Sequence, residues 1–416
     1  MALILAASLP LPVNAQEEST SQSEILTHLE KLQAEIQRLQ VEIEKLKQQQ
    51  ELMAKEPAQQ AKVSATPTEA AQEAVPAKKR STPAWLNRFS FRGKSYLRYS
   101  WELQPGQRNF NEFDLDRFYF TAYMRVNDRV RMRYTVEGAR RDSNGDFDVA
   151  TKYFYLEASD LLYKSSRLFL GQAGLPWVPH EEHLWGYRFQ GTVFPDREGY
   201  LTSTDLGIGW KASFPKGYGD YHFAVVNGEG WHANEVGKHK DFHLRVTLKP
   251  FAHHQWGKAF FLTGFRSVGS YDGVAAGLPN DRKRTLAQLG FHRPYWTIAG
   301  EYLWAADLAD SMQKRHPSLA ARAGQIAHGR GYSLFGVLNF GLFSEAAESW
   351  EVIARFDRLD PDIEIGNNEH FRWIAGLSYR WNKYLQTLID FERVQFDPGS
   401  LRTNERRLMV QSEIKF

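Results

Sequence analysis

The chain has 416 residues, no cysteine and a formal net charge of +3 at neutral pH. This near balance of charge excludes strong bulk attraction to nucleic acid, and the absence of cysteine excludes a disulfide framework. Aromatic residues make up 14% of the chain, and past the first residues no apolar run approaches the about 20 residues of a membrane helix. If the protein spans a membrane, it must therefore do so as a closed β-barrel.

The first fifteen residues have the composition of a targeting segment. Residues 2–12 are apolar, and Ala15 is a small residue placed for cleavage before Gln16. The segment lacks the usual positively charged start, so we interpret residues 1–15 as a partial or atypical signal peptide. The alternative is an ordinary buried N-terminal strand.

Residues 24–53 carry a heptad pattern, in which apolar residues recur at alternating spacings of four and three. The repeat is formed by Ile25, Leu29, Leu32, Ile36, Leu39, Ile43, Leu46 and Met53. A lone helix with so narrow an apolar stripe cannot bury it, so the helix must pair with copies of itself. We predict a coiled coil and a homo-oligomer; the alternative is a surface helix packed on the rest of the protein. Residues 54–84, rich in Ala, Pro, Gln, Glu and Thr, are predicted to be a flexible or extended linker.

From Phe89 onward the period of the pattern changes to two, which is typical of strands with one apolar and one polar face. Sixteen candidate strands lie near 89–103, 112–126, 130–140, 151–158, 167–173, 204–214, 218–228, 240–249, 256–267, 284–293, 295–304, 330–341, 348–359, 369–382, 384–394 and 404–416. The connections after odd-numbered strands are long, and those after even-numbered strands are mostly short. Long loops on one side and short turns on the other are typical of a transmembrane barrel.

The last strand carries the clearest alternation. Leu408, Val410, Ile414 and Phe416 fall on one face, whereas Arg407, Gln411, Glu413 and Lys415 fall on the other. A terminal aromatic residue that closes such a strand resembles the C-terminal signature of bacterial outer-membrane barrels. We therefore predict an all-β transmembrane fold over residues 85–416, a 16-stranded antiparallel barrel preceded by a periplasmic α-helical coiled coil.

A barrel of sixteen strands encloses an aqueous channel, so its polar faces should line water. The candidate pore-lining residues are Arg92, Lys94, Arg98, Arg117, Arg125, Arg131, Arg133, Arg245, Arg372 and Arg380. The same faces carry a further arginine and six acidic residues: Arg355, Glu102, Glu137, Glu351, Asp357, Asp390 and Glu392. A basic wall would favour anions; alternatively, these charges pair with each other and simply keep the wall wet.

The longest connection, residues 173–203, follows the fifth strand. In general porins the loop at this position folds into the lumen and narrows it; the alternative is a loop on the rim. Its candidate constriction residues are Glu181, Glu182, Arg188, Asp196, Arg197 and Glu198. His180 and His183 flank two of these carboxylates, but the spacing is short and a third anchored ligand is missing, so we expect no metal.

Three short motifs carry a resemblance to a known family: Gly171-Gln172, then Phe194-Pro195-Asp196-Arg197, then Ser203-Thr204-Asp205-Leu206-Gly207. Together with the order of coiled coil and barrel, they resemble the phosphate-selective porin (O and P type) family. The resemblance implies a trimeric sixteen-stranded porin of the Gram-negative outer membrane. Departures from the family pattern at Ala173-Gly174-Leu175-Pro176-Trp177 leave its phosphate-binding residues without assigned positions here.

We therefore predict a passive diffusion channel for small hydrophilic solutes or ions. Anion preference is one of the two alternatives stated above for its wall charges. The expected partners are outer-membrane lipid and further copies of the chain. A homotrimer is expected from the resemblance, although isoleucine at heptad position a with leucine at d favours two strands. No cofactor and no enzymatic activity are expected. The alternative function is a structural tether or spacer that acts through the coiled coil.

Overall fold

The computed structural model describes residues 37, 85–103, 111–140, 146–161, 163–235, 237–255, 257–274 and 277–416. The chain divides into two units, residues 1–80 and 81–416, and only the second is described in any length. The predicted signal peptide and linker lie outside the described residues. So does the predicted coiled coil, apart from Gln37, which is helical. The domain bounds given above therefore stay predictions.

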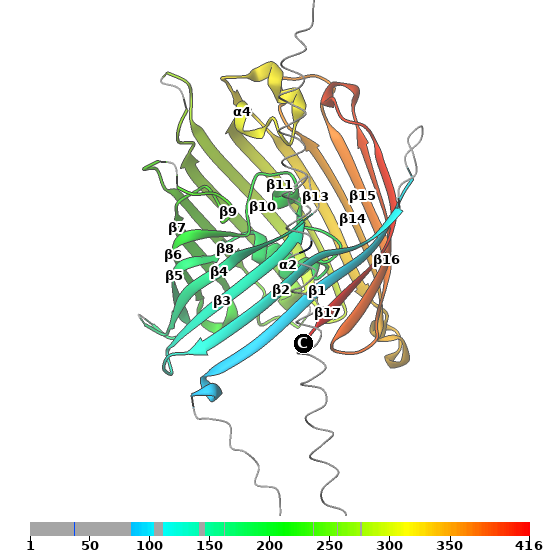
Figure 1. Ribbon diagram of the computed structural model, residues 1–416. Coiled ribbons are helices and arrows are strands. Elements are labelled where there is room, and N and C mark those ends of the chain that lie inside the picture. The colour runs from blue at the N-terminus through cyan, green and yellow to red at the C-terminus, as the bar shows by residue number, and fades with distance from the viewer. Residues whose placement is uncertain are drawn as a thin grey trace, which may run out of the picture. The chain divides into compact units, whose positions relative to one another are not determined.

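Residues 85–416 form one antiparallel sheet (Figure 1). Its strands are β1 (Phe89–Glu102), β2 (Asn111–Arg125), β3 (Val130–Arg140), β4 (Phe147–Ser159), β5 (Ser166–Gly174), β6 (Thr204–Ser213), β7 (Gly219–Val226), β8 (Asp241–Leu248), β9 (Phe260–Ser270), β10 (Asp281–Arg293), β11 (Trp296–Leu308), β12 (Ile326–Ala327), β13 (Arg330–Asn339), β14 (Trp350–Asp360), β15 (His370–Arg380), β16 (Leu385–Phe396) and β17 (Glu405–Lys415).

The sheet closes on itself, because β1 pairs with β2 on one side and with β17 on the other. The two-residue strand β12 and the longer strand β13 both pair with β11, one directly after the other. The two therefore occupy one strand position in the barrel. With β12 and β13 counted as one, the barrel has sixteen strands among the described residues. The predicted fold class is confirmed for this part of the chain.

Short helices lie in the connections between strands. They are η1 (Leu86–Arg88), α2 (Val178–Trp185), α3 (Phe194–Arg197), η2 (Pro215–Gly217), η3 (Gly257–Ala259), α4 (Ala309–Met312), η4 (Pro317–Arg322), η5 (Phe340–Leu342), η6 (Glu345–Ala347) and η7 (Pro398–Ser400). The connections follow the predicted asymmetry: 175–203 and 309–325 are long, whereas 126–129 and 381–384 are tight turns. The C-terminus and the start of β1 lie at the end of the barrel opposite α4 (Figure 1).

Among the described residues, no helix is both long enough and apolar enough to cross a bilayer.

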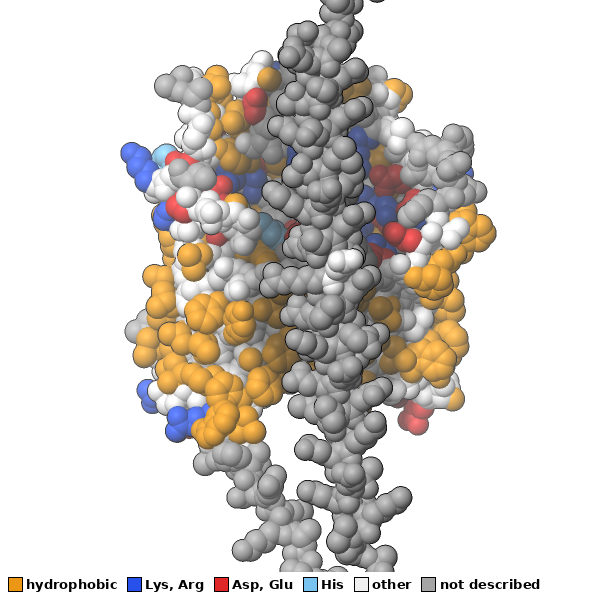
Figure 2. Space-filling model, in the orientation of Figure 1, with side chains coloured by type: hydrophobic (Ala, Val, Ile, Leu, Met, Phe, Trp, Pro, Cys, Tyr) orange, Lys and Arg blue, Asp and Glu red, His pale blue; other side chains and the backbone are white. Residues whose placement is uncertain are grey.

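Burial is inverted relative to a water-soluble protein. Large apolar side chains such as Phe120, Leu244 and Ile389 are exposed on the outer face, while Glu137 and Gln411 are buried on the inner one. On the visible face, Figure 2 shows hydrophobic side chains gathered over the middle and lower part of the wall, with charged side chains above them and at the lower edge. This pattern places lipid outside and water inside the sheet.

Two strands begin earlier than the sequence pattern predicts. Strand β4 starts at Phe147 instead of 151, and β10 starts at Asp281 instead of 284. In β4 the cause is a bulge: the register with β3 shifts between Thr135 and Val136, which leaves Lys152 as an extra residue. Because a bulge moves the alternation to the other face, the residues before Lys152 do not continue the pattern of those after it.

The C-terminal residue completes the closure. The backbone of Phe416 exchanges two hydrogen bonds with Gly93 of β1, at N–O distances of 3.0 and 3.1 Å. Its ring covers Gly93, where an added Cβ would lie 2.0 Å from the ring. The ring of Phe118 covers Gly138 in the same way. An aromatic ring that packs over a glycine on a neighbouring strand stabilises the pairing of the two strands and fixes their register.

This contact predicts opposite effects for two glycine-to-alanine variants. Gly93→Ala should displace the ring of Phe416 and lower the stability of the barrel by about 1–3 kcal/mol. Gly264→Ala in β9 is the matched control, because a Cβ there meets no atom within 4 Å, and alanine itself favours a strand over glycine. Denaturant unfolding in detergent micelles, followed by tryptophan fluorescence, measures both. Equal midpoints for the two variants would contradict the proposed closure contact.

Candidate functional site: a lumen narrowed by an inward loop

The connection between β5 and β6, residues 175–203, lies inside the barrel; we call it the lumen loop (Figure 1). It contains α2 and α3, each with proline in its first turn, where the missing N–H costs no helical hydrogen bond. Helix α2 ends at Gly186, which has a φ of 74°, a conformation that glycine adopts without strain. The side chains of Trp177, Trp185 and Phe194 are at most 1% exposed.

The lumen loop packs against one side of the inner wall. Its apolar side chains form two clusters with wall residues. Tyr96 of β1 belongs to the second cluster, and most of the wall residues lie on β9 to β16, namely Phe261, Phe265, Leu286, Ala299, Leu303, Ala305, Phe335, Ile353, Leu359, Ile374 and Leu388. The inner wall is therefore not polar all round, as the sequence pattern had suggested. The half that the loop covers carries apolar side chains interspersed among buried polar and charged ones, and burial of the apolar ones helps to hold the loop in place.

A buried charge network anchors α2 to this wall. Glu181 accepts hydrogen bonds from the indole of Trp177 at 3.1 Å and from Arg355 at 3.2 Å. Arg355 also binds Asp357 at 2.8 Å and lies 5.6 Å from the ring centre of Trp185. Burial raises the pKa of Glu181 to about 6, although the Arg355 guanidinium opposes this shift. The arginine therefore holds a carboxylate that would otherwise be costly to bury.

The six candidate constriction residues divide into two groups. Glu182 and Arg188 pair with each other at 2.7 Å and line the open lumen. The other four make contacts within the loop or between the loop and the wall. Glu181 binds Arg355, and Glu198 binds His370. Asp196 accepts a hydrogen bond from Thr192, and Arg197 binds Gln190 and Glu392. Burial and the charge of Arg372 lower the pKa of Arg197 to about 10. Most charges of this segment therefore hold the loop and do not face the channel.

The open part of the lumen lies between the loop and the opposite wall, formed mainly by β1 to β8. It contains three neighbouring cavities of about 530, 450 and 530 Å³, all of which Tyr123 lines. Counted once each, fifteen Lys and Arg residues but only five Asp and Glu residues line them. The bulk charge of the chain is nearly balanced, so this excess is a local property of the channel wall.

All ten candidate pore-lining residues lie on strands, but their surroundings differ. Six of them line the three cavities: Arg92, Lys94, Arg125, Arg131, Arg133 and Arg245. The other four pair with carboxylates away from these cavities: Arg98 with Asp114 and Asp116, Arg117 with Glu137, Arg372 with Glu392, and Arg380 with Glu351. Pairing also occurs beside the cavities, where Lys94 binds Glu413, Arg131 binds Glu157 and Arg245 binds Asp220. The described residues give no carboxylate partner to the other three, Arg92, Arg125 and Arg133.

Three arginines surround one tyrosine of β2. The guanidinium carbons of Arg92, Arg131 and Arg133 lie 5.5, 5.5 and 5.7 Å from the ring centre of Tyr123. Arg131 pairs with Glu157 at 2.9 Å, but among the described residues Arg92 and Arg133 have no carboxylate partner within ion-pair distance. Such a group presents several guanidinium donors to one small volume, as a phosphate or carboxylate ligand requires.

Sequence reasoning missed several basic residues of the cavities. Lys152 escaped it because it lies at the bulge of β4. Lys249 and Lys258 fall within the predicted strands 240–249 and 256–267 but were not chosen as candidates; in the structure they lie just after β8 and just before β9. Arg167 and Lys211 do alternate within β5 and β6, so a stricter assignment of faces along those two strands would have found them.

His180 and His183, considered above as metal ligands, belong to neither of the two side-chain groups whose ligand atoms lie close enough together for one metal ion. His180 contacts Gln288 at 3.2 Å, and burial holds the pKa of this imidazole well below its usual range. Among the described residues, two other groups of three have ligand atoms close enough for one metal ion: Glu198 with His316 and His370, and Glu229 with Glu235 and Asp272.

The anchoring network predicts that two arginines of the wall differ in importance. Arg355→Met should lower the stability by about 3–5 kcal/mol, because it leaves buried carboxylates without a counter-charge. Arg380→Met removes an arginine whose side chain is 46% exposed, paired with Glu351 at 2.6 Å, and should cost at most about 1 kcal/mol. Denaturant unfolding of the two variants in micelles makes the comparison. Equal losses would mean that Arg355 does not anchor the loop.

No family model and no curated protein sequence matches the chain. Solved structures do: OmpF of Salmonella typhi in complex with daunomycin has a TM-score of 0.55 at 9% identity, over 79% of this chain and 97% of that one. An anion-selective porin from Comamonas acidovorans scores 0.54 at 11% identity, over 79% and 99%. Outer-membrane expressed OmpT of Vibrio cholerae scores 0.51 at 10%, over 79% and 97%. At these identities the likeness shows a shared fold, that of outer-membrane porin barrels.

Proposed function

We propose that this protein is a passive diffusion channel in the outer membrane of a Gram-negative-type bacterium, with a preference for small anions. One observation carries the proposal: the open cavities beside the lumen loop have three times as many basic as acidic side chains. A wall of one charge in a narrow aqueous passage raises the local concentration of ions of opposite charge. The fold that the chain shares with outer-membrane porins supports the location and the channel function.

The proposal extends to the parts of the chain outside the described residues. In it, residues 24–53 form a periplasmic coiled coil, residues 54–84 link it to the barrel, and three copies of the chain assemble. The heptad pattern supports self-association, and the family resemblance supports the number three. The alternative role of the coiled coil, as a tether or spacer, is compatible with a channel and would be detected by pull-down with purified peptidoglycan.

Phosphate is the specific anion that we propose, on the basis of the family resemblance. The grouping of Arg92, Arg131 and Arg133 around Tyr123 supports it, because guanidinium donors match the oxygens of a phosphate in pairs. Inorganic phosphate added to a chloride solution should then reduce the chloride current at concentrations where sulfate does not. Equal reduction by the two anions would leave a general anion channel.

Planar-bilayer recording tests the anion preference and the contribution of individual charges. The purified protein should give discrete conductance steps in groups of three, with a reversal potential in a salt gradient on the anion-selective side. The double variant Arg92→Gln/Arg133→Gln should shift this potential toward zero, because a charge about 7 Å from a passing ion contributes about 0.6 kcal/mol even in water.

Arg393→Gln is the matched control for charge. Arg393 lies on the outer face of β16, 5.7 Å from the ring centre of Trp373, so its loss changes the net charge without changing the lumen. Its reversal potential should equal that of the parent protein. A cation-selective parent protein, or equal shifts in the two variants, would refute the proposed anion preference; a silent bilayer with folded protein would refute the channel.

The lumen loop should limit the conductance. Replacing residues 178–197 by a short Gly-Ser linker removes the two helices and the side chains that fill one side of the lumen. The single-channel conductance should rise, and the anion preference should persist, since the basic wall of β1 to β8 is left intact. Unchanged conductance in a folded barrel would mean that the loop does not narrow the conducting path.

A further inference from the structure

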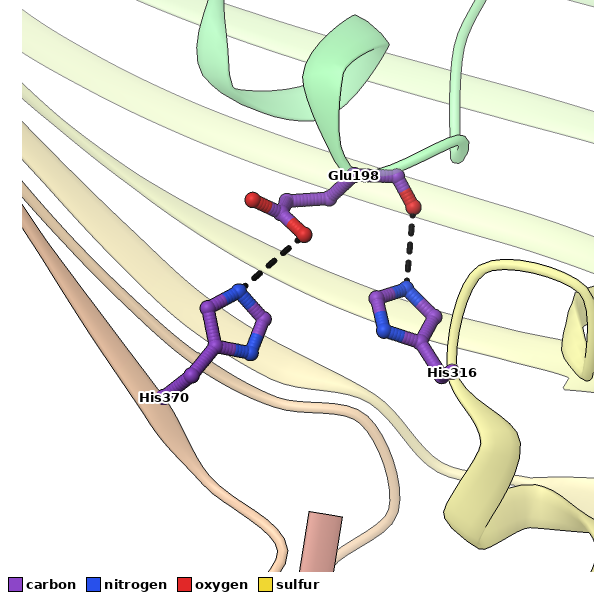
Figure 3. A group of neighbouring side chains, drawn as sticks. All are labelled: Glu198, His316 and His370. Carbon is purple, nitrogen blue, oxygen red and sulfur yellow. Dashed lines mark hydrogen bonds and ion pairs between the residues drawn. The ribbon is translucent and has the colours of Figure 1, made fainter. Parts of the chain in front are cut away.

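Three buried side chains from distant parts of the chain meet at one point beside the lumen loop (Figure 3). Glu198 directly follows α3, His316 precedes η4 in the connection after α4, and His370 is the first residue of β15. All three are at most 3% exposed. The mechanism of diffusion proposed above uses none of them, so the cluster needs a separate explanation.

Glu198 orients both imidazole rings. The Nε2 atom of His370 lies 3.1 Å from its carboxylate oxygen, and the Nε2 atom of His316 lies 3.0 Å from its backbone carbonyl oxygen. A carbonyl can only accept, so Nε2 of His316 carries the proton and its Nδ1 is bare in the neutral ring. A metal-binding histidine usually donates its second N–H to a carboxylate or a carbonyl, as Nε2 of His316 does to the carbonyl of Glu198.

The two imidazole rings lie beside each other at the carboxylate of Glu198 (Figure 3). They are nearly parallel, with centres 6.1 Å apart. One nitrogen from each histidine and a carboxylate oxygen of Glu198 lie within 4.8 Å of one another. A point between three such atoms is at most about 2.8 Å from each, whereas zinc binds nitrogen and oxygen at about 2.0–2.2 Å. Inward movements below about 1 Å would complete the coordination.

A carboxylate oxygen without a hydrogen-bond partner also indicates that the cluster binds a metal ion. Oε1 of Glu198 is buried and has no hydrogen-bond partner among the described residues, although its twin Oε2 is bound by His370. A buried anionic oxygen without a donor is costly, and a metal ion would remove that cost. The neighbouring cation of Arg372 is already engaged by Glu392 and does not supply this partner.

We propose that Glu198, His316 and His370 form a binding site for one divalent transition-metal ion of the zinc class. Two imidazoles and one carboxylate are a donor set that zinc accepts, with a fourth position left for water. The bound ion would join the end of the lumen loop to the connection after α4 and to the wall at β15. It would therefore fix the loop in its seat, independently of whether the channel prefers anions.

Metal titration of the purified full-length protein in detergent micelles, after treatment with a chelator, tests the site. Calorimetry with Zn²⁺ should give one site per chain, and Co²⁺ should give the visible absorption bands of a low-symmetry N/O site. Zn²⁺ should also raise the unfolding temperature of the parent protein, because a ligand that binds only the folded state stabilises it.

Variants separate this cluster from other ligands on the surface. Each of Glu198→Gln, His316→Gln and His370→Gln should weaken Zn²⁺ binding at least about tenfold and abolish the Co²⁺ bands. The controls Asp272→Asn, in the second carboxylate group, and His254→Gln, an exposed histidine, should bind as the parent does. Gel mobility of unheated samples reports whether each barrel is folded.

Three results would overturn the site. They are no Zn²⁺ binding by the folded parent protein, equal binding by the cluster variants and the controls, and loss of binding only in the Asp272→Asn variant. In each case the cluster would be a hydrogen-bonded latch between loop and wall without a metal. Because His316 lies in a connection and not in a strand, its variant is expected to fold even if the His370 variant does not.

Discussion

Closure of the sheet is the constraint on which the rest of the structure depends. In hydrocarbon every backbone N–H and C=O must find a partner within the protein, and a sheet satisfies this only when its first and last strands pair. Here that pair is β1 and β17, joined over nine residue pairs from Lys94–Lys415 to Glu102–Arg407 and completed by Phe416 on Gly93. The closed sheet gives each strand an inner and an outer face, and all the other features are consequences of that division.

Within the barrel, the lumen loop divides the inner wall into two halves of different chemistry. Strands β9 to β16 supply the apolar seat for Trp177, Trp185 and Phe194. Charges on this side are paired at close range, as Arg355 is with Glu181 and Asp357. The opposite half keeps basic side chains such as Arg92 and Arg125 that are exposed to the lumen. The residues that hold the loop therefore differ from the basic residues to which we attribute the proposed anion preference.

The sequence alone predicts the barrel well, because alternation with period two and the parity of loop lengths are local properties. All sixteen long strands lie at the predicted places, and the lipid face of the last strand is as expected. The prediction fails where a contact between segments distant in the sequence determines the local structure. The bulge at Lys152 depends on the register with β3. The inward orientation of Glu198 depends on His370, 172 residues later. Composition cannot reveal which Phe, Leu and Ile residues of β9 to β16 point inward to contact the loop, because the same residue types also face the lipid.

The side on which the loop packs has a physical reason. Had α2 packed against β1 to β4, it would have taken Arg92, Arg125 and Arg133 out of water, and none of these has a carboxylate partner among the described residues. Removing an unpaired guanidinium from water costs several kcal/mol, more than the burial of one large apolar side chain returns. On the β9 to β16 side, each buried arginine that the loop touches already has its carboxylate, as Arg355 and Arg372 do. The distribution of acidic partners along the strands therefore selects the seat of the loop, and the basic half stays open because burying it would be unfavourable.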